Sequence, residues 1–247
     1  MTKVNVNGTD LNYEEIGAGT SLLFLACTID DSAAKWVEHM GRYASGYRVI
    51  IPDIRGLAGN ARVVDVEPSD WVADMAGLVD ALGVPSVTVV AETLGSRIGA
   101  RLAVDHPAKV SALILNGLIA RSNPDGDAWR RQMFMPGTAK PESVERMRIY
   151  QGDSWAEAAE FYVNMHEKES FRDYFDIPSI AGNVQAPTLI VRGDIDDAVH
   201  PIEHSTAVHA GVANSRLAIY PNTGFNVMTS HPEDFWRLVG DFLKETS

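Results

Sequence analysis

The chain has little of what marks several common protein classes. Cys27 is the single cysteine among 247 residues, so no disulfide can form within the chain. No stretch reaches the roughly 20 apolar residues that a membrane-spanning helix needs, and residues 1–5 begin no apolar run of signal-peptide length. We therefore expect a cytoplasmic protein with no membrane partner.

Basic residues are also scarce. Lys and Arg total 21 against 33 Asp and Glu, which gives a net charge of −12. This charge disfavours binding to nucleic acid and to anionic membranes, so neither is an expected partner. The sequence shows no His, Asp or Glu pair with metal-ligand spacing and no glycine-rich phosphate loop, so we expect no metal and no cofactor.

Two alternating patterns fill most of the chain. Short runs rich in Val, Ile and Leu are typical of strands buried on both faces, and they lie at 21–26, 47–51, 86–91, 110–115, 187–191 and 216–220. Helical patterns lie at 33–43, 68–82, 94–106 and 232–244, with Ser69-Asp70 as a cap for the second. This alternation predicts an α/β fold with a mostly parallel sheet flanked by helices. Residues 3–6 and 11–16, joined by Asn7-Gly8, predict an antiparallel hairpin.

One segment interrupts the alternation. Residues 119–183 contain amphipathic stretches with many aromatic and methionine side chains and no buried-strand run. We interpret 119–183 as a helical lid inserted into a core formed by 1–118 and 184–247. A lid of this composition suits a small, largely apolar ligand, although the same side chains also suit the lid's own core.

Three landmarks resemble the α/β-hydrolase family, in its epoxide-hydrolase and lactonase-like branch. The first is Ile51-Pro52-Asp53-Ile54-Arg55-Gly56, which looks like the Asp-x-Arg-Gly stretch of that branch. The second is residues 89–96, which occupy the place of the family's strand, nucleophile elbow and helix. The third is residues 187–196, which resemble the strand and turn that carry the acid of the triad. The resemblance implies an α/β-hydrolase fold with an inserted lid.

The sequence departs from the family at the positions that carry the chemistry. Thr93 stands in place of the nucleophilic serine, and Phe225 follows Gly224 where the family has its histidine. A β-branched residue at a strained elbow implies either a relaxed turn or retained strain of about 1–3 kcal/mol. Without the histidine, Thr93 lacks its usual base. Asp196 remains at the acid position.

The resemblance also selects candidate binding residues. Backbone N–H groups near Cys27 or Thr28, together with that of Leu94, could form an oxyanion pocket. Phe225 and three lid residues, Tyr150, Tyr162 and His166, are expected to face the ligand. Glu92 is expected to be structural. His200 and His204, after the acid turn, are expected on a surface helix.

Three functions remain open on this pattern. The first is an enzyme that catalyses cyclisation, elimination, decarboxylation or rearrangement of an apolar oxygenated metabolite by positioning and electrostatics, with Thr93 and Asp196 as catalytic residues. The second is a small-molecule binder without activity. The third is an unusual hydrolase that uses Thr93 with a base from elsewhere. The sequence leaves the oligomeric state open.

Overall fold

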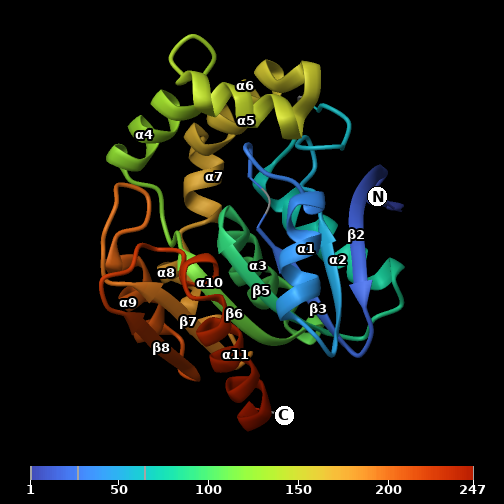
Figure 1. The fold of residues 1–247 in the computed structure, drawn as a ribbon, viewed down its shortest axis with the longest axis vertical. Helices are drawn as coiled ribbons and strands as arrows, with labels where there is room; N and C mark the ends of the chain where they lie inside the picture. The colour runs from blue at the N-terminus through green and yellow to red at the C-terminus, as the bar shows by residue number, and fades with distance from the viewer. Residues whose placement is uncertain (1, 27, 64, 247) are drawn as a thin grey trace.

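The computed structural model describes residues 2–26, 28–63 and 65–246. Its centre is an eight-stranded sheet with the order β1-β2-β4-β3-β5-β6-β7-β8 (Figure 1). The strands are β1 (Thr2–Val6), β2 (Thr9–Gly17), β3 (Thr20–Leu25), β4 (Tyr47–Pro52), β5 (Val87–Thr93), β6 (Val110–Leu118), β7 (Thr188–Gly193) and β8 (Ser215–Tyr220).

The strand pairing confirms both predictions about the sheet. Neighbouring strands from β4 to β8 run parallel, whereas β1 pairs with β2, and β2 with β4, in the antiparallel sense. The chain leaves β3 towards β4 on one side and returns to β5 on the other. In open α/β sheets, ligands bind at the carboxyl ends of the strands beside such a change of direction. The fold therefore directs attention to the loops after β3 and β5.

Helices cover both faces of the sheet (Figure 1). On one face, α1 (Ala33–Tyr43) packs against β2, β4 and α11 (Pro232–Thr246). On the other face, α3 (Leu94–Asp105) packs against β5, β6 and α2 (Pro68–Ala81), and α9 (Ile202–Gly211) packs against β7 and β8. The apolar stripes predict these contacts, because α1 buries Trp36 and Met40 and α11 buries Phe235 and Phe242.

The start of α2 differs in detail from the prediction. The cap was expected at Ser69-Asp70, but the N-cap residue is Glu67 and the helix begins at Pro68. Asp70 takes part from the third helical position, where its carboxylate accepts the N–H of Glu67 at 2.9 Å. Proline is well suited to the first helical position, since its missing N–H would have no helical partner there.

The segment between β6 and β7 is helical, as the sequence predicts. It contains α4 (Pro124–Phe134), α5 (Pro141–Gln151), α6 (Trp155–Glu167), α7 (Glu169–Tyr174) and α8 (Ile177–Ile180). In Figure 1, α4, α5 and α6 stand at the top of the molecule, and α7 runs from them down towards the core. The division at residues 119 and 183 remains a prediction. No helix within the described part of the chain is long and apolar enough to cross a membrane.

Candidate active site

The turn from β5 into α3 keeps the strained geometry of a nucleophile elbow. Thr93 lies in this turn with φ 49° and ψ −120°. A Cβ on Gly95 would lie 1.9 Å from the carbonyl oxygen of Leu25, so only glycine fits where the elbow passes the end of β3. The elbow is therefore not relaxed: a β-branched residue is held at positive φ, at a cost of about 1–3 kcal/mol. Strain of this kind commonly persists at functional sites.

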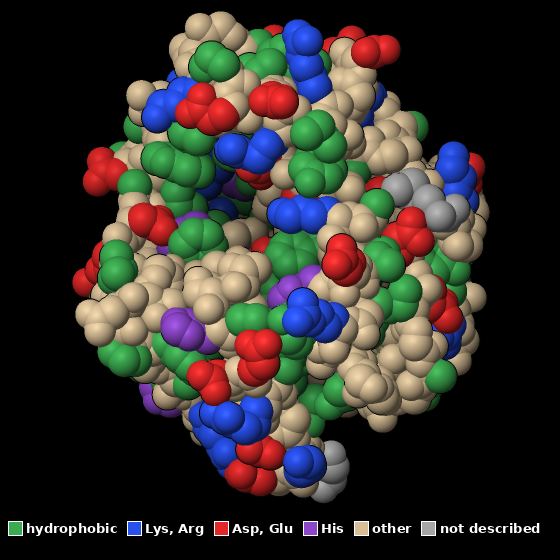
Figure 2. Space-filling view, in the orientation of Figure 1, with side chains coloured by type: hydrophobic (Ala, Val, Ile, Leu, Met, Phe, Trp, Pro, Cys, Tyr) green, Lys and Arg blue, Asp and Glu red, His purple; other side chains and the backbone are tan. Residues whose placement is uncertain are grey.

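Thr93 opens onto a cavity of about 290 Å³ between the sheet and α4. The hydroxyl oxygen of Thr93 is buried and has no hydrogen-bond partner among the described residues. Figure 2 shows this face hollowed between the helices at the top of the view and the core below, with basic and histidine side chains visible inside. The cavity is lined by Thr28, Asp30, Thr93, Ile119, Trp129, Arg130, Phe134, Tyr162, Asp197, Val199, His200 and Phe225.

The cavity contains a histidine that the sequence pattern placed elsewhere. His200 was expected on a surface helix, but it precedes α9 and its side chain is 6% exposed. His204, within α9, is also buried. That expectation was wrong because His200 lies in the turn before α9 that lines the cavity, and His204 lies in α9, which packs against β7 and β8.

The ring of His200 is held by Asp197. Its Nδ1 lies 3.0 Å and 3.1 Å from the two carboxylate oxygens of Asp197, which fixes Nδ1 as the protonated nitrogen. Nε2 is buried and has no hydrogen-bond partner among the described residues. Burial lowers the pKa of His200 despite Asp197. Burial alone opposes ionisation of Asp197, but hydrogen bonds from the ring and from the N–H groups of His200 and Val199 lower its pKa to about 2.

Phe225, which follows Gly224 where the family resemblance places a histidine, lies against His200. The two rings are stacked, with centroids 3.7 Å apart and an interplanar angle of 5°. Gly117 allows this placement, since a Cβ there would lie 2.6 Å from the ring of Phe225. Phe225 thus forms one wall of the cavity and covers one face of the His200 ring.

A cationic side chain lies at the α4 side of the same cavity. Arg130 is 4% exposed and donates to Asp127 at 2.8 Å. Asp127 also accepts from Arg172 at 3.0 Å, so one carboxylate is shared by two guanidinium groups. Arg130 also hydrogen-bonds to the hydroxyl of Tyr162, whose pKa is raised by burial. One positive charge is thus left over within this group of two guanidinium groups and one carboxylate, whereas the carboxylates of Asp30 and Asp197 lie elsewhere on the cavity lining.

A second cavity of about 480 Å³ reaches Thr93 from the side of α1. Glu92 lines it and is 5% exposed. Burial, reinforced by the nearby charge of Asp31, raises the pKa of Glu92 to about 8. Burial also raises the pKa of Asp31 to about 6, although Lys35 pairs with Asp31 at 3.0 Å. The carboxyl group beside Thr93 is thus largely uncharged at neutral pH.

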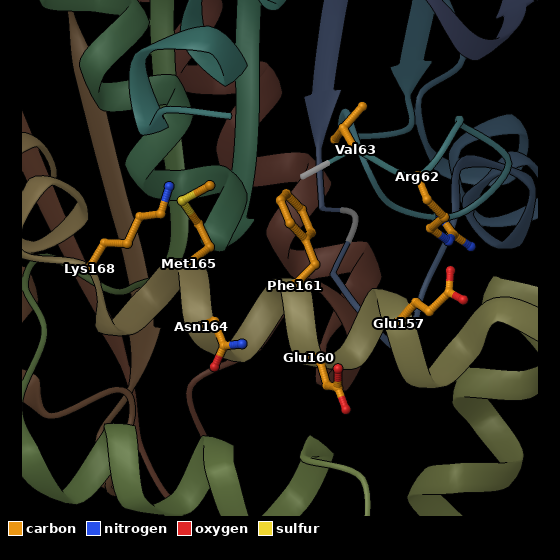
Figure 3. Close-up of a pocket in the computed structure, with 8 residues that line it drawn as sticks. All are labelled: Arg62, Val63, Glu157, Glu160, Phe161, Asn164, Met165 and Lys168. Atoms are coloured by element: carbon orange, nitrogen blue, oxygen red, sulfur yellow. The ribbon is translucent and has the colours of Figure 1, made fainter. Parts of the chain in front are cut away.

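A further groove runs along the outer side of α6. Figure 3 shows Phe161 pointing from α6 towards the loop that carries Arg62 and Val63. Arg62 is occupied, because it donates to the carbonyl oxygens of Gly56 and Gln151 at 2.9 Å each. The groove shares no lining residue with the Thr93 cavity among those described. Its arginine joins its own loop to the end of α5.

The predicted site residues separate into two groups. Thr28, Thr93, Tyr162 and Phe225 line the Thr93 cavity, and Leu94 follows Thr93 at the first position of α3. Cys27 lies outside the described residues. The other predicted residues, described next, do not contact this cavity.

Asp196, Tyr150 and His166 lie away from the described lining of the cavity. Asp196 is half exposed and its carboxylate accepts from Arg192 at 2.9 Å and from the N–H of Ile202 at 2.7 Å, so it caps α9. His166 is buried between Tyr162 and Phe171, and its pKa is well below the usual range because of burial and nearby Arg130. The roles predicted for these residues have no support from their positions.

Sequence reasoning missed His200, Asp197 and Arg130. A partial signal existed in residues 196–200, where two adjacent carboxylates precede a histidine. Which of Asp196 and Asp197 faces inward depends on the path of the turn, which the sequence pattern does not give. Within the described part of the chain, no group of three or more His, Cys, Asp or Glu side chains is arranged to hold a metal ion.

The comparisons with known proteins agree with this geometry. The family model described as the alpha/beta hydrolase fold matches residues 20–142. A Pseudomonas putida protein named 2-hydroxy-6-oxo-2,4-heptadienoate hydrolase is 27% identical, with 98% of this chain and 99% of that protein covered. A second from the same species, named 2-hydroxy-6-oxononadienedioate/2-hydroxy-6-oxononatrienedioate hydrolase 2, is 26% identical over 95% of this chain and 91% of its own. A meta-cleavage product hydrolase from Pseudomonas fluorescens superimposes with a TM-score of 0.82 at 18% identity, covering 100% of this chain and 98% of that chain.

These findings correct the functional prediction. Non-hydrolytic chemistry was expected first and a binder without activity second, but the relatives are named hydrolases, including a carbamate hydrolase of Variovorax paradoxus. The names of these relatives overturn both expectations, which rested on the loss of the serine and of the histidine after Gly224; the structure places another histidine, His200, in the cavity. The strand order, the matched family model and the structural neighbours show that this chain has the α/β-hydrolase fold.

Proposed function

We propose that the protein is a hydrolase that attacks the carbonyl carbon of a small, carboxylate-bearing substrate with a water molecule activated by His200. One observation carries this proposal. Thr93 and His200 line one cavity, and the Thr93 hydroxyl oxygen and His200 Nε2 are buried without a hydrogen-bond partner among the described residues. Buried polar atoms normally find partners, so a substrate and a water molecule are the natural occupants of this space.

His200 has the chemistry of a general base. Asp197 holds the Nδ1–H, which leaves the lone pair of Nε2 directed away from Asp197. Because burial lowers the pKa of His200, the ring is neutral and able to accept a proton at neutral pH. In the proposed step, the water oxygen bonds to the carbonyl carbon while Nε2 of His200 takes one water proton. The bond between that carbon and the leaving group then breaks with its electron pair going to the leaving group, and the proton on Nε2 passes to the leaving group, which leaves the carboxylic acid as the other product.

The elbow supplies the groups that polarise the carbonyl oxygen. Leu94 is the first residue of α3, so its N–H has no helical partner. The N–H after the nucleophile position is one of the two oxyanion donors of this fold. We assign the Thr93 hydroxyl as a further donor to the same oxygen. Thr93 and His200 then replace the serine and histidine of the usual triad without a covalent intermediate.

The substrate class follows from the walls of the cavity. Trp129 and Phe134 give it an apolar side, and Arg130 gives it a cationic end. Arg97, also buried, lies near enough to Arg130 that its charge, added to burial, lowers the pKa of Arg97 to about 9. A carboxylate would be stabilised beside these groups. The names of the Pseudomonas putida relatives specify substrates that are carboxylates, a dienoate and a dienedioate.

The test compares two esters that differ by one carboxylate. Initial rates are measured with 4-nitrophenyl hydrogen glutarate and 4-nitrophenyl pentanoate, and with 2-hydroxy-6-oxo-2,4-heptadienoate as the substrate named for a relative. The charged ester is expected to react faster. Arg130→Gln is expected to raise KM for the charged ester about 10- to 100-fold, because a hydrogen bond to a charged group is worth about 1.5–3 kcal/mol. Arg131→Gln is the matched control, since Arg131 is half exposed on the same helix.

The second arm of the test addresses the base. His200→Gln is expected to lower kcat/KM about 100- to 10,000-fold, with His209→Gln as the control from α9. Thr93→Ala is expected to remove only part of the rate, and no burst of product is expected in the wild type, because no covalent intermediate forms. Full activity in His200→Gln, or no turnover of any of the three substrates, would refute the proposal.

A further inference from the structure

The side chain of Glu92 ties the elbow to the loop that carries Phe225. Its Oε2 accepts from Asn226 Nδ2 at 2.7 Å and from Asn116 Nδ2 at 3.3 Å. Asn116 Nδ2 also donates to Asn226 Oδ1 at 2.9 Å, which closes a triangle of three side chains. The three residues come from β5, β6 and the loop before α10 (Val227–Ser230).

The triangle also fixes the backbone of that loop. Asn116 Oδ1 accepts the N–H groups of Val227 and Met228 at 3.2 Å and 3.3 Å. Asn226 Oδ1 accepts the N–H of Thr229 at 3.1 Å. Residues 226–229 are thus held to the carboxyl ends of β5 and β6, and Phe225 is the residue immediately before them.

Phe225 transmits this restraint to His200. Its ring lies 3.7 Å from the imidazole in a nearly parallel stack, against Gly117 on the sheet side. Asp197 holds only one edge of the His200 ring. Stacking on Phe225 is therefore what fixes the tilt of the imidazole and covers one of its faces.

We propose that Glu92 is a positioning residue: through Asn226 it holds Phe225 against His200 and so sets the orientation and burial of that imidazole. The inference rests on the proposed role of His200 as the base. It assigns a function to a residue whose carboxyl group does not reach the reacting atoms. The loop that carries the family's histidine keeps a catalytic purpose here, because its aromatic ring supports a histidine from another loop.

Other charged groups surround both ends of this chain of contacts. Asp31, which precedes α1, and Lys35 of α1 act on Glu92. Arg192 of β7, Arg130 of α4 and Asp197 act on His200. These groups stay in place when Glu92 is changed to an uncharged residue. The variants of Glu92 must therefore separate the loss of its charge from the loss of its hydrogen bond to Asn226.

The experiment is a double-mutant cycle read by the proton NMR titration of His200, assigned with His200→Gln among the seven histidines. Glu92→Ala is expected to move the His200 titration to higher pH, because the ring loses its cover. It should also lower kcat about 10- to 100-fold with little change in KM, as expected for a misplaced catalytic group. Glu92→Gln retains an acceptor for Asn226, so His200 in this variant is expected to titrate as it does in the wild type.

Phe225→Ala provides the decisive comparison. It should shift the His200 titration as Glu92→Ala does, and adding Glu92→Ala to Phe225→Ala should cause no further shift. Asp74→Asn in α2 disrupts the ion pair between Asp74 and Arg55 and serves as the control for loss of stability. It should leave the titration of His200 unchanged. The inference would be overturned if Glu92→Ala shifted the His200 titration equally in the wild type and in Phe225→Ala. It would also be overturned if Glu92→Ala caused no shift.

The titration needs no turnover, so its result is separate from that of the proposed function. A shift of His200 in Glu92→Ala in a protein that cleaves none of the test substrates would support the positioning contact and refute the hydrolase proposal. If the protein is active and His200 titrates in Glu92→Ala as in the wild type, the hydrolase proposal is supported and the positioning contact is refuted.

Discussion

Replacing Glu92 by glutamine should change how the stability of the protein depends on pH. Burial raises the pKa of Glu92 from 4.5 to about 8, so the folded protein keeps a proton that the unfolded chain loses near pH 4.5. Unfolding therefore releases a proton between these two values, and the free energy of unfolding falls as the pH rises through that window. Stability contributed by the protonated carboxyl is complete below pH 4.5 and lost by about pH 8.

The size of the effect follows from the shift. One pKa unit corresponds to about 1.4 kcal/mol, so a shift of this size amounts to about 5 kcal/mol at full ionisation. The side chain is 5% exposed, so solvent screens little of it. Glutamine has the shape of the protonated acid and keeps an acceptor for Asn226. Glu92→Gln and the wild type should have similar stability at pH 4.5, and the variant should be more stable by several kcal/mol at pH 9.

Urea denaturation followed by tryptophan fluorescence at pH 4.5, 7 and 9 measures this difference. Glu38→Gln is the control, because Glu38 is an exposed glutamate on α1, and its effect should not vary with pH. The buried histidines also titrate, but they contribute equally to both proteins and cancel in the difference. The charge of Asp31 acts on Glu92, so its effect is part of the measured difference. A stability difference between Glu92→Gln and the wild type that is the same at pH 4.5 and pH 9 would refute the reasoning.

Three more predictions concern the base, the elbow and the core. The value of kcat/KM should stay constant as the pH is lowered through 6.5 and fall only below it, because burial lowers the pKa of His200; a fall centred above pH 6.5 would contradict this. Gly95→Ala should cost more than about 3 kcal/mol in urea denaturation, since its Cβ would lie 1.9 Å from the carbonyl oxygen of Leu25; wild-type stability would show that the elbow can move. Asp74→Asn should cost about 3–5 kcal/mol by the same assay, because it leaves the largely buried guanidinium of Arg55 without its carboxylate; a loss below about 1 kcal/mol would show that water reaches Arg55.

The fold was predictable from the sequence because its signals are local. Buried parallel strands appear as continuous apolar runs, and the helices between them as periodic patterns. The run at 86–91 sits in β5, whose side chains are buried up to Glu92. The strand extends to Thr93 because the elbow follows directly, and no apolar residue marks that end.

The active site was predictable only where the family pattern fixes a position along the chain. Thr93 and Phe225 lie in the cavity because they occupy the elbow and the loop after β8, whose places the fold determines. Asp196 was selected because it ends residues 187–196, which resemble the strand and turn that carry the acid of the triad. In the structure the turn sends Asp196 to cap α9 and Asp197 to the imidazole of His200.

By itself the sequence determined the α/β-hydrolase fold, the strained elbow position of Thr93 and the absence of a histidine after Gly224. Only the tertiary structure decided that His200 faces Thr93 across a cavity, that Phe225 stacks on that histidine, and that Glu92 holds the loop between them. The physical reason is that apolar periodicity reports which residues are buried, and it depends on neighbours within a few positions. Contacts between Glu92, Asn226 and His200 join loops far apart along the chain, and they arise only when the sheet brings the ends of its strands together.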